Sequence, residues 1–122
     1  MLLLLGIAIA GALGALARYK VDAAVVRVAP SGLPAATLAI NVSGSFVLGF
    51  ITGLALYHGF PSTPKTILGT GFCGAFTTFS TFAYEVVVLA EQRNRRAAGL
   101  TVALSVVVPT LAAALGLALA SL

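Results

Sequence analysis

The sequence predicts an all-α membrane protein in which four transmembrane helices form one domain over residues 1–122, with the third helix broken near its middle. Hydrophobic residues make up 60% of the chain and charged residues only 8%, which is too few charges to cover a water-soluble globule of this length. Apolar runs recur along the chain, each about as long as the 20 residues that cross a bilayer. Within the third run, glycines, hydroxyl residues and phenylalanines are interleaved between Gly71 and Phe82, which is untypical of an uninterrupted helix.

Composition also argues against several classes of function. The net charge of +4 does not indicate a nucleic-acid partner, because the basic residues lie between apolar runs, where orientation in the membrane explains them. The single cysteine, Cys73, excludes an intrachain disulfide and a multi-cysteine metal site. The sequence suggests no carboxylate pair, no nucleophile with a base and no metal-ligand cluster, so we do not expect an enzyme.

The first helix is predicted from about residue 2 to about residue 26. Gly6, Ala10 and Gly14 recur every four residues and present a smooth face on which another helix can pack closely.

Arg18 is expected at or just inside the membrane boundary, with Asp22 four positions later. One interpretation is a snorkelling arginine in an i,i+4 ion pair. The other is a cation that holds the fold or attracts anions at a pore mouth. The residues alone leave both open.

The second helix is predicted over about residues 33–57, after a loop that contains Pro30, Gly32 and Pro34. Asn41 lies near its middle, where an amide is costly unless it has a partner. Asn41 is therefore either a fastener between helices or part of a polar pathway.

The third span is predicted over about residues 64–91 and contains the interleaved stretch. Glycine and the consecutive Thr77 and Thr78 weaken a helix, and backbone groups freed in a bilayer must find partners. We expect a broken helix whose loose backbone and side chains form a small-ion site, the alternative being a helix softened only for close packing. Glu85 is expected near a membrane exit.

The fourth helix is predicted over about residues 97–119. Thr101 and Ser105 lie one turn apart on one face, where they could form a hydroxyl track. The next position of that face is Pro109, which predicts a kink and a freed carbonyl.

Together these residues resemble the Fluc/CrcB family of fluoride channels. The likeness is in four places, residues 11–19, Asn41 with residues 44–46, residues 71–82, and Glu85, so it extends over most of the chain. The run Thr-Thr-Phe-Ser-Thr-Phe is its most specific part.

The resemblance implies an antiparallel, dual-topology dimer with two fluoride pores and a structural sodium ion at its centre. By the same resemblance, backbone carbonyls of Gly74 and Thr77 would hold the sodium ion, and Arg18 and Glu85 would lie at a pore mouth or support the fold. The residues that would line the anion path are Asn41, Phe79, Ser80, Thr81, Phe82 and Ser105.

Two positions depart from the family's pattern. Ala75 stands where the family often repeats glycine. Pro109 stands where the family often has a further polar residue of the pore.

The implied function is passive export of fluoride through a multi-pass protein of the prokaryotic plasma (inner) membrane. Fluoride is small and strongly hydrated, so a pore must replace its water with donors. The Asn41 amide and the hydroxyls supply donors without a fixed positive charge, and the phenylalanines add the positive edges of their rings.

Two other functions are considered. A proton-coupled exporter like the small multidrug resistance family needs an acid in the first helix, and residues 1–17 contain none. A structural subunit that only packs in a larger complex is the other alternative.

The charges of the connecting loops predict one orientation. Positive-inside bias would put the basic side in the cytoplasm and both termini outside. An antiparallel homodimer needs both orientations, so a heterodimer with an oppositely oriented homologue is the alternative to the homodimer that we expect. The expected basic side holds Arg18, Lys20, Arg27, Arg93, Arg95 and Arg96, against Lys65 and His58 on the other.

Overall fold

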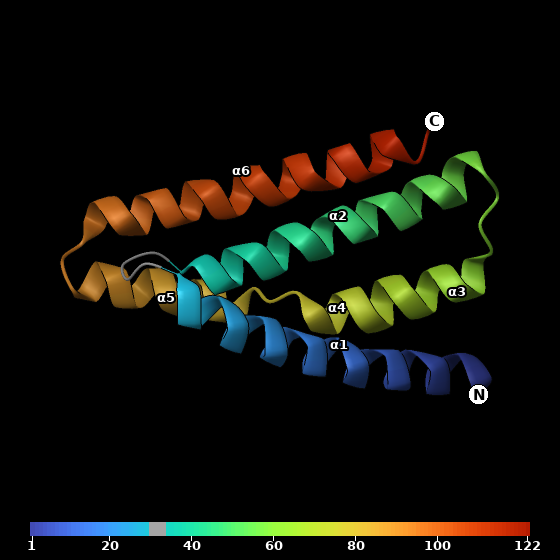
Figure 1. Cartoon of the computed structure of the whole chain (residues 1–122), viewed down its shortest axis with the longest axis horizontal. Helices are drawn as coiled ribbons and strands as arrows, with labels where there is room; N and C mark the ends of the chain where they lie inside the picture. Colours follow the sequence, from blue (N-terminus) through green and yellow to red (C-terminus); the bar gives the residue numbers. More distant parts are fainter. Residues whose placement is uncertain (30–33) are drawn as a thin grey trace.

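A computed structural model describes residues 1–29 and 34–122, and there the chain is helical apart from short connections (Figure 1). Four segments are long and apolar enough to cross a membrane: Leu2–Val28, Ala35–Tyr57, Ser62–Glu91 and Arg95–Leu119. The prediction of four spans is thus confirmed. The elements are α1 (Leu2–Val28), α2 (Ala35–Tyr57), α3 (Ser62–Thr66), the π-helix η1 (Ile67–Cys73), α4 (Gly74–Phe76), α5 (Ser80–Glu91) and α6 (Arg95–Leu119).

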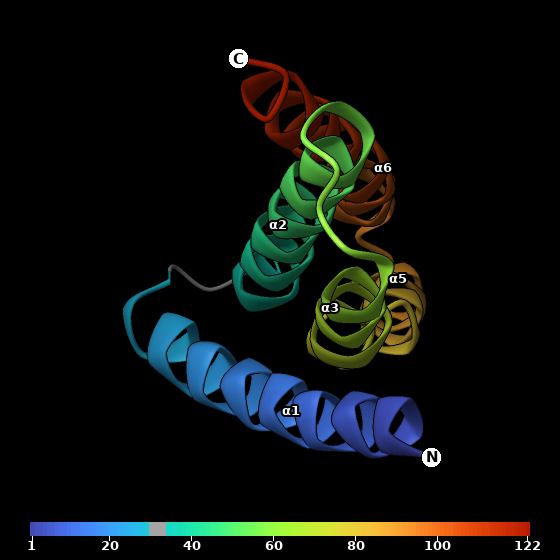
Figure 2. The ribbon, with the colours of Figure 1, turned by 90° about the vertical axis from the view of Figure 1, so that its right-hand side faces the viewer.

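The spans pack as two pairs. α2 lies along α6, and α1 lies against η1 and α4 of the third span (Figures 1 and 2). Both termini are at the same end of the bundle (Figure 1).

Small residues set the distance between α1 and the third span, as predicted. Ala10 and Gly14 are the buried residues of α1. A side chain on Gly14 would collide with the Phe72 carbonyl, so the two backbones are in direct contact. Such close approach stabilises the helix pair by van der Waals contact. This matters in a membrane, because the hydrophobic effect contributes little to helix association inside lipid.

Glycines bring α2 and α6 equally close. A Cβ on Gly116 would collide with the Phe46 carbonyl and lie 2.8 Å from the Phe50 amide nitrogen. A Cβ on Gly49 would collide with the Ala113 carbonyl. These contacts place residues 46–50 of α2 at the level of residues 113–116 of α6.

We expect Gly116→Ala to destabilise the protein by about 1–3 kcal/mol, because the new methyl group must push the two backbones apart. The measurement is thermal unfolding in detergent. Gly99→Ala is the matched control in the same helix, since nothing lies within 4 Å of its added Cβ. Equal melting temperatures for the two variants would contradict the close contact of α2 with α6.

The third span is broken, as predicted, between α4 and α5. Thr77 is extended, with φ −76° and ψ 160°, and helix resumes at Ser80. The break separates the four phenylalanines of this stretch into two pairs. Phe72 stacks on Phe76 before it, and Phe79 meets Phe82 edge-on after it. The π-helix η1 was not predicted.

Several predicted boundaries shift. α1 ends at Val28 rather than Val26, and the third span begins at Ser62 rather than Pro64. The predicted start of the second helix at residue 33 lies outside the described residues, as do Pro30 and Gly32 of the loop.

The last helix begins at Arg95 rather than Ala97, because the Asn94 side chain accepts a hydrogen bond from the Ala97 amide and caps it. Arg95 and Arg96 therefore belong to its first turn and not to the loop. The helix continues without interruption through Pro109.

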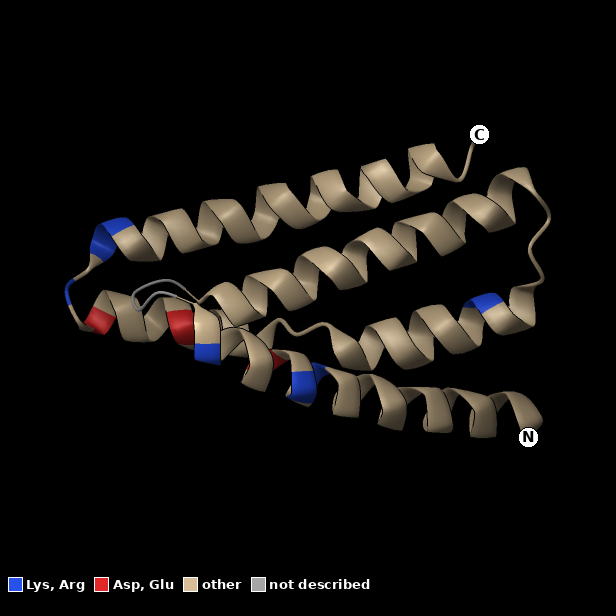
Figure 3. Ribbon diagram, in the orientation of Figure 1, with Lys and Arg blue, Asp and Glu red and all other residues tan. Residues whose placement is uncertain are grey.

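Charged residues gather at one end of the bundle (Figure 3). That end contains the last part of α1 and the turn between α5 and α6, whereas Lys65 in α3 lies near the opposite end, with the termini (Figures 1 and 3). The structure thus has the uneven distribution that the loop charges predict.

Candidate functional site

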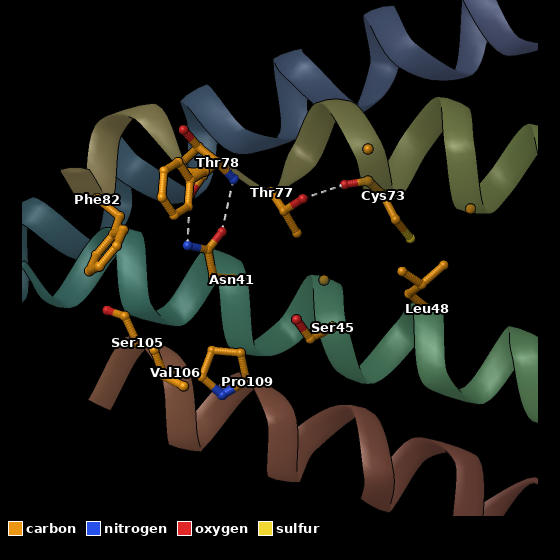
Figure 4. A pocket seen from close by; sticks show the side chains of 14 residues that line it. Asn41, Ser45, Leu48, Cys73, Thr77, Thr78, Phe82, Ser105, Val106 and Pro109 are labelled. Atoms are coloured by element: carbon orange, nitrogen blue, oxygen red, sulfur yellow. Dashed lines mark hydrogen bonds between the residues drawn. The ribbon is translucent and has the colours of Figure 1, made fainter. Parts of the chain in front are cut away.

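Asn41 closes the break in the third span. Its Nδ2 donates a hydrogen bond to the Thr78 carbonyl and its Oδ1 accepts one from the Thr78 amide, each over 2.8 Å (Figure 4). Both backbone polar groups of a residue outside any helix are thereby satisfied, which a bilayer requires. Asn41 is a fastener between α2 and the break, and Nδ2 carries a second hydrogen that can be donated elsewhere.

The Thr78 side chain starts the helix that follows. Its Oγ1 accepts a hydrogen bond from the Thr81 amide over 3.2 Å and donates one to Thr81 Oγ1 over 3.1 Å. Ser80 Oγ lies 3.5 Å from the same atom. The side chain takes the role of an N-terminal cap of α5, so the hydroxyls of Thr78, Ser80 and Thr81 form one cluster.

The break leaves the carbonyls of Gly74 and Thr77 without their helical donors. The Thr78 amide, which would donate to the Gly74 carbonyl in a continuous helix, is bonded to Asn41, and the Thr81 amide, which would donate to Thr77, is bonded to Thr78 Oγ1. Arg18 Nη1 donates to the Thr77 carbonyl over 3.3 Å. Arg18 thus contacts the break itself, which fits the interpretation of a cation that holds the fold.

A pocket of about 350 Å³ lies beside the break, between α2, α6 and the third span (Figure 4). The rings of Phe79 and Phe82 are at its wall, with centroids 5.5 Å apart and planes at 60°. Phe79 is 78% exposed, so much of its ring is left uncovered by the chain itself. The predicted site residues that line this pocket are Asn41, Gly74, Thr77, Phe79, Phe82 and Ser105.

A second pocket of about 300 Å³ lies on the other side of Thr78. It is more polar, since Arg18, Asp22, Thr37 and Thr81 line it. Thr78 lines both pockets and forms a common wall.

Comparison with known proteins decides the family. A sequence model of the family described as CrcB-like protein, Camphor Resistance (CrcB), matches residues 5–117. The chain belongs to the CrcB family. The resemblance inferred from the sequence is therefore confirmed.

Named relatives of this CrcB family member are fluoride channels. It is 57% identical over 100 residues to "Fluoride-specific ion channel FluC 1" of Leifsonia xyli, covering 82% of this chain and 73% of that protein. It is 47% identical over 89 residues to "Fluoride-specific ion channel FluC" of Methanocaldococcus jannaschii, covering 73% and 70%. It is 45% identical over 119 residues to "Fluoride-specific ion channel FluC 2" of Cutibacterium acnes, covering 97% of both. These names describe channels, in agreement with the expectation that the chain is not an enzyme.

The remaining predicted residues do not line the first pocket of this CrcB family member. Thr81 and Arg18 line the second pocket, and Ser80 contacts Thr78. Glu85 Oε1 accepts a hydrogen bond from Thr37 Oγ1 over 2.8 Å, and its buried Oε2 has no partner among the described residues. Since Thr37 is in the first turn of α2, Glu85 lies toward the charged end of the bundle.

Two residues of the site were not predicted, Thr37 and Thr78. A signal for Thr37 exists, because Thr37, Asn41 and Ser45 recur every four residues on one face of α2. The signal for Thr78 is the Thr78-x-x-Thr81 spacing at a helix start.

Proposed function

We propose that the chain is a fluoride-specific channel through which fluoride leaves a prokaryotic cell passively across its plasma membrane, which lowers the fluoride concentration in the cytoplasm. The names of its relatives support the substrate. The observation that carries the proposal is the pocket in which the Asn41 amide, the Ser105 hydroxyl and the edges of Phe79 and Phe82 meet at a helix break.

The donors of that pocket suit an anion that must leave as readily as it enters. Hydrogen bonds to charged groups are worth about 1.5–3 kcal/mol each, so a few can offset part of the lost hydration. No basic residue lines the first pocket among the described residues, and Arg18 lies in the neighbouring one. A cation near the entrance attracts fluoride without trapping it at the narrowest point.

The alternative function, a proton-coupled exporter like the small multidrug resistance family, is less well supported. A proton-coupled exporter needs an acid in its binding pocket, and the described residues around the first pocket include none. Glu85 and Asp22 lie at the charged end instead.

The proposed channel is an antiparallel dimer. The first pocket is open along one side, and the exposed ring of Phe79 needs a cover that this chain does not provide. An inverted second copy would supply it and complete two pores. We propose a homodimer, with an oppositely oriented homologue as the alternative partner.

The proposed dimer also holds a structural sodium ion. The carbonyls of Gly74 and Thr77 would be its ligands from each copy, and both are released from helical hydrogen bonding by the Asn41 and Thr78 contacts. Hard carbonyl oxygens are suitable ligands for a hard cation, which would neutralise the converging carbonyl dipoles. Arg18 already donates to the Thr77 carbonyl, so it would share that oxygen with the ion or move away.

The orientation of this chain in the membrane tests whether its partner is a second copy or a homologue. The uneven charges favour one orientation, whereas a homodimer needs both, so we expect reporters fused to the C-terminus to give signal from both sides when this chain is expressed alone. An exclusively external terminus, with fluoride flux appearing only after a homologue is added, would overturn the homodimer.

The function itself is tested with purified protein in liposomes. Fluoride efflux down its gradient, without a proton gradient, is the expected result. Proton-coupled dye uptake would favour the exporter, and the absence of both would favour a structural subunit.

A further inference from the structure

Hydroxyl residues of α2 continue beyond the pocket at the break. Ser45 and Thr52 follow Asn41 by four and eleven positions, which places all three on one face of the helix. Asn41 and Ser45 line the first pocket (Figure 4), and Thr52 lies further toward the end of α2 that faces away from the charged end of the bundle.

A further pocket of about 320 Å³ connects these hydroxyls. It is lined by Ser45 and Thr52 on α2 and by Ala113 and Leu117 on α6. Ser45 and Leu48 line this pocket and the first one, so the two pockets are neighbours along the groove between α2 and α6.

The hydroxyls of Ser45 and Thr52 are not used by the chain itself. Ser43, on the same helix, is exposed and bonds back to the Ala39 carbonyl over 2.7 Å, and Thr110 on α6 bonds back to Val106 over 2.6 Å. Ser45 and Thr52 make no hydrogen bond with any described residue. A free hydroxyl in the hydrocarbon layer is costly, so these two are expected to serve water or a ligand.

α6 offers no donor at this level. Its hydroxyl face passes through Thr101 and Ser105 and then reaches Pro109, which lines the first pocket with Ser45. The contacts of Gly49 with Ala113 and of Gly116 with Phe46 put the following part of α6 opposite Ser45 and Thr52. Its side chains toward the pocket there are Ala113, Ala114 and Leu117, all apolar.

We infer that the anion path crosses from α6 to α2 at Pro109, and that Ser45 and Thr52 carry fluoride from the phenylalanine pair toward the far mouth. This inference rests on the proposed fluoride function. The α2 hydroxyls take over where Pro109 ends the α6 track, and Ser45 and Thr52 lie about 10 Å apart along the helix.

The test is fluoride efflux from liposomes that contain single variants. Ser45→Ala and Thr52→Val each remove one donor with little change of volume, and each should slow efflux at least about tenfold, as expected for one lost hydrogen bond to an ion. Thr52→Ser keeps the hydroxyl and should restore the wild-type rate. Ser43→Ala is the matched control, and it should leave efflux unchanged because its hydroxyl is already bonded to the helix.

Wild-type rates in both Ser45→Ala and Thr52→Val would overturn the inference while leaving the fluoride function intact. The same follows if Thr52→Ser is as slow as Thr52→Val, since shape and not the hydroxyl would then matter. No efflux from the wild-type protein, either alone or with an oppositely oriented homologue, would instead refute the proposed function. Gel filtration of each variant separates a lost donor from a lost fold.

Discussion

Replacing Asn41 by aspartate is expected to reduce fluoride efflux about 100-fold or more, since the hydrogen bonds that Nδ2 donates to the Thr78 carbonyl and to the proposed ion, together about 3 kcal/mol, are both lost. Asn41 Nδ2 donates to the Thr78 carbonyl over 2.8 Å, and a carboxylate oxygen there would face another acceptor. The variant also places a negative charge beside the proposed anion path. The measurement is efflux from liposomes at equal protein content.

Asn94→Asp is the control for this change. Asn94 caps α6 outside the hydrocarbon layer, where aspartate caps equally well, so efflux should not change. Normal fluoride efflux in Asn41→Asp would contradict the role of Asn41 as both a fastener and a donor.

Replacing Phe79 or Phe82 by isoleucine is expected to slow efflux about two- to tenfold, because ring-edge contacts are worth about 0.5–1.5 kcal/mol. Isoleucine keeps an apolar surface but has no positive edge to offer the ion. Efflux is measured for each single variant, with dimer formation checked in detergent.

Phe72→Ile is the matched control, since Phe72 stacks on Phe76 before the break and does not line the first pocket. Unchanged efflux in both Phe79→Ile and Phe82→Ile would assign the pair to packing alone.

The sequence was sufficient to predict the spans and the break, because both follow from local properties. Apolar runs of membrane length identify the helices, and the glycines with Thr77 and Thr78 locate the weak point. The π-helix η1 could not be predicted, since its wider turn leaves no distinct periodicity in seven residues.

The contacts of the site could not be predicted for a different reason. Asn41 and Thr78 are 37 positions apart, and Arg18 and Thr77 are 59 apart, so their pairing depends on how the helices pack. The sequence showed that Asn41 needed a partner but left fastener and pathway open. The structure makes Asn41 a fastener that also lines the pocket.

The function proposed for this chain requires selective passage of fluoride. The decisive measurement is the rate of fluoride efflux and of chloride efflux from the same liposomes, with the purified wild-type protein and no other subunit. We expect fluoride to leave down its gradient while chloride stays inside. Equal loss of both ions would contradict the proposal that donors at a helix break form a fluoride pore, and so would retention of both ions that persists after an oppositely oriented homologue is added.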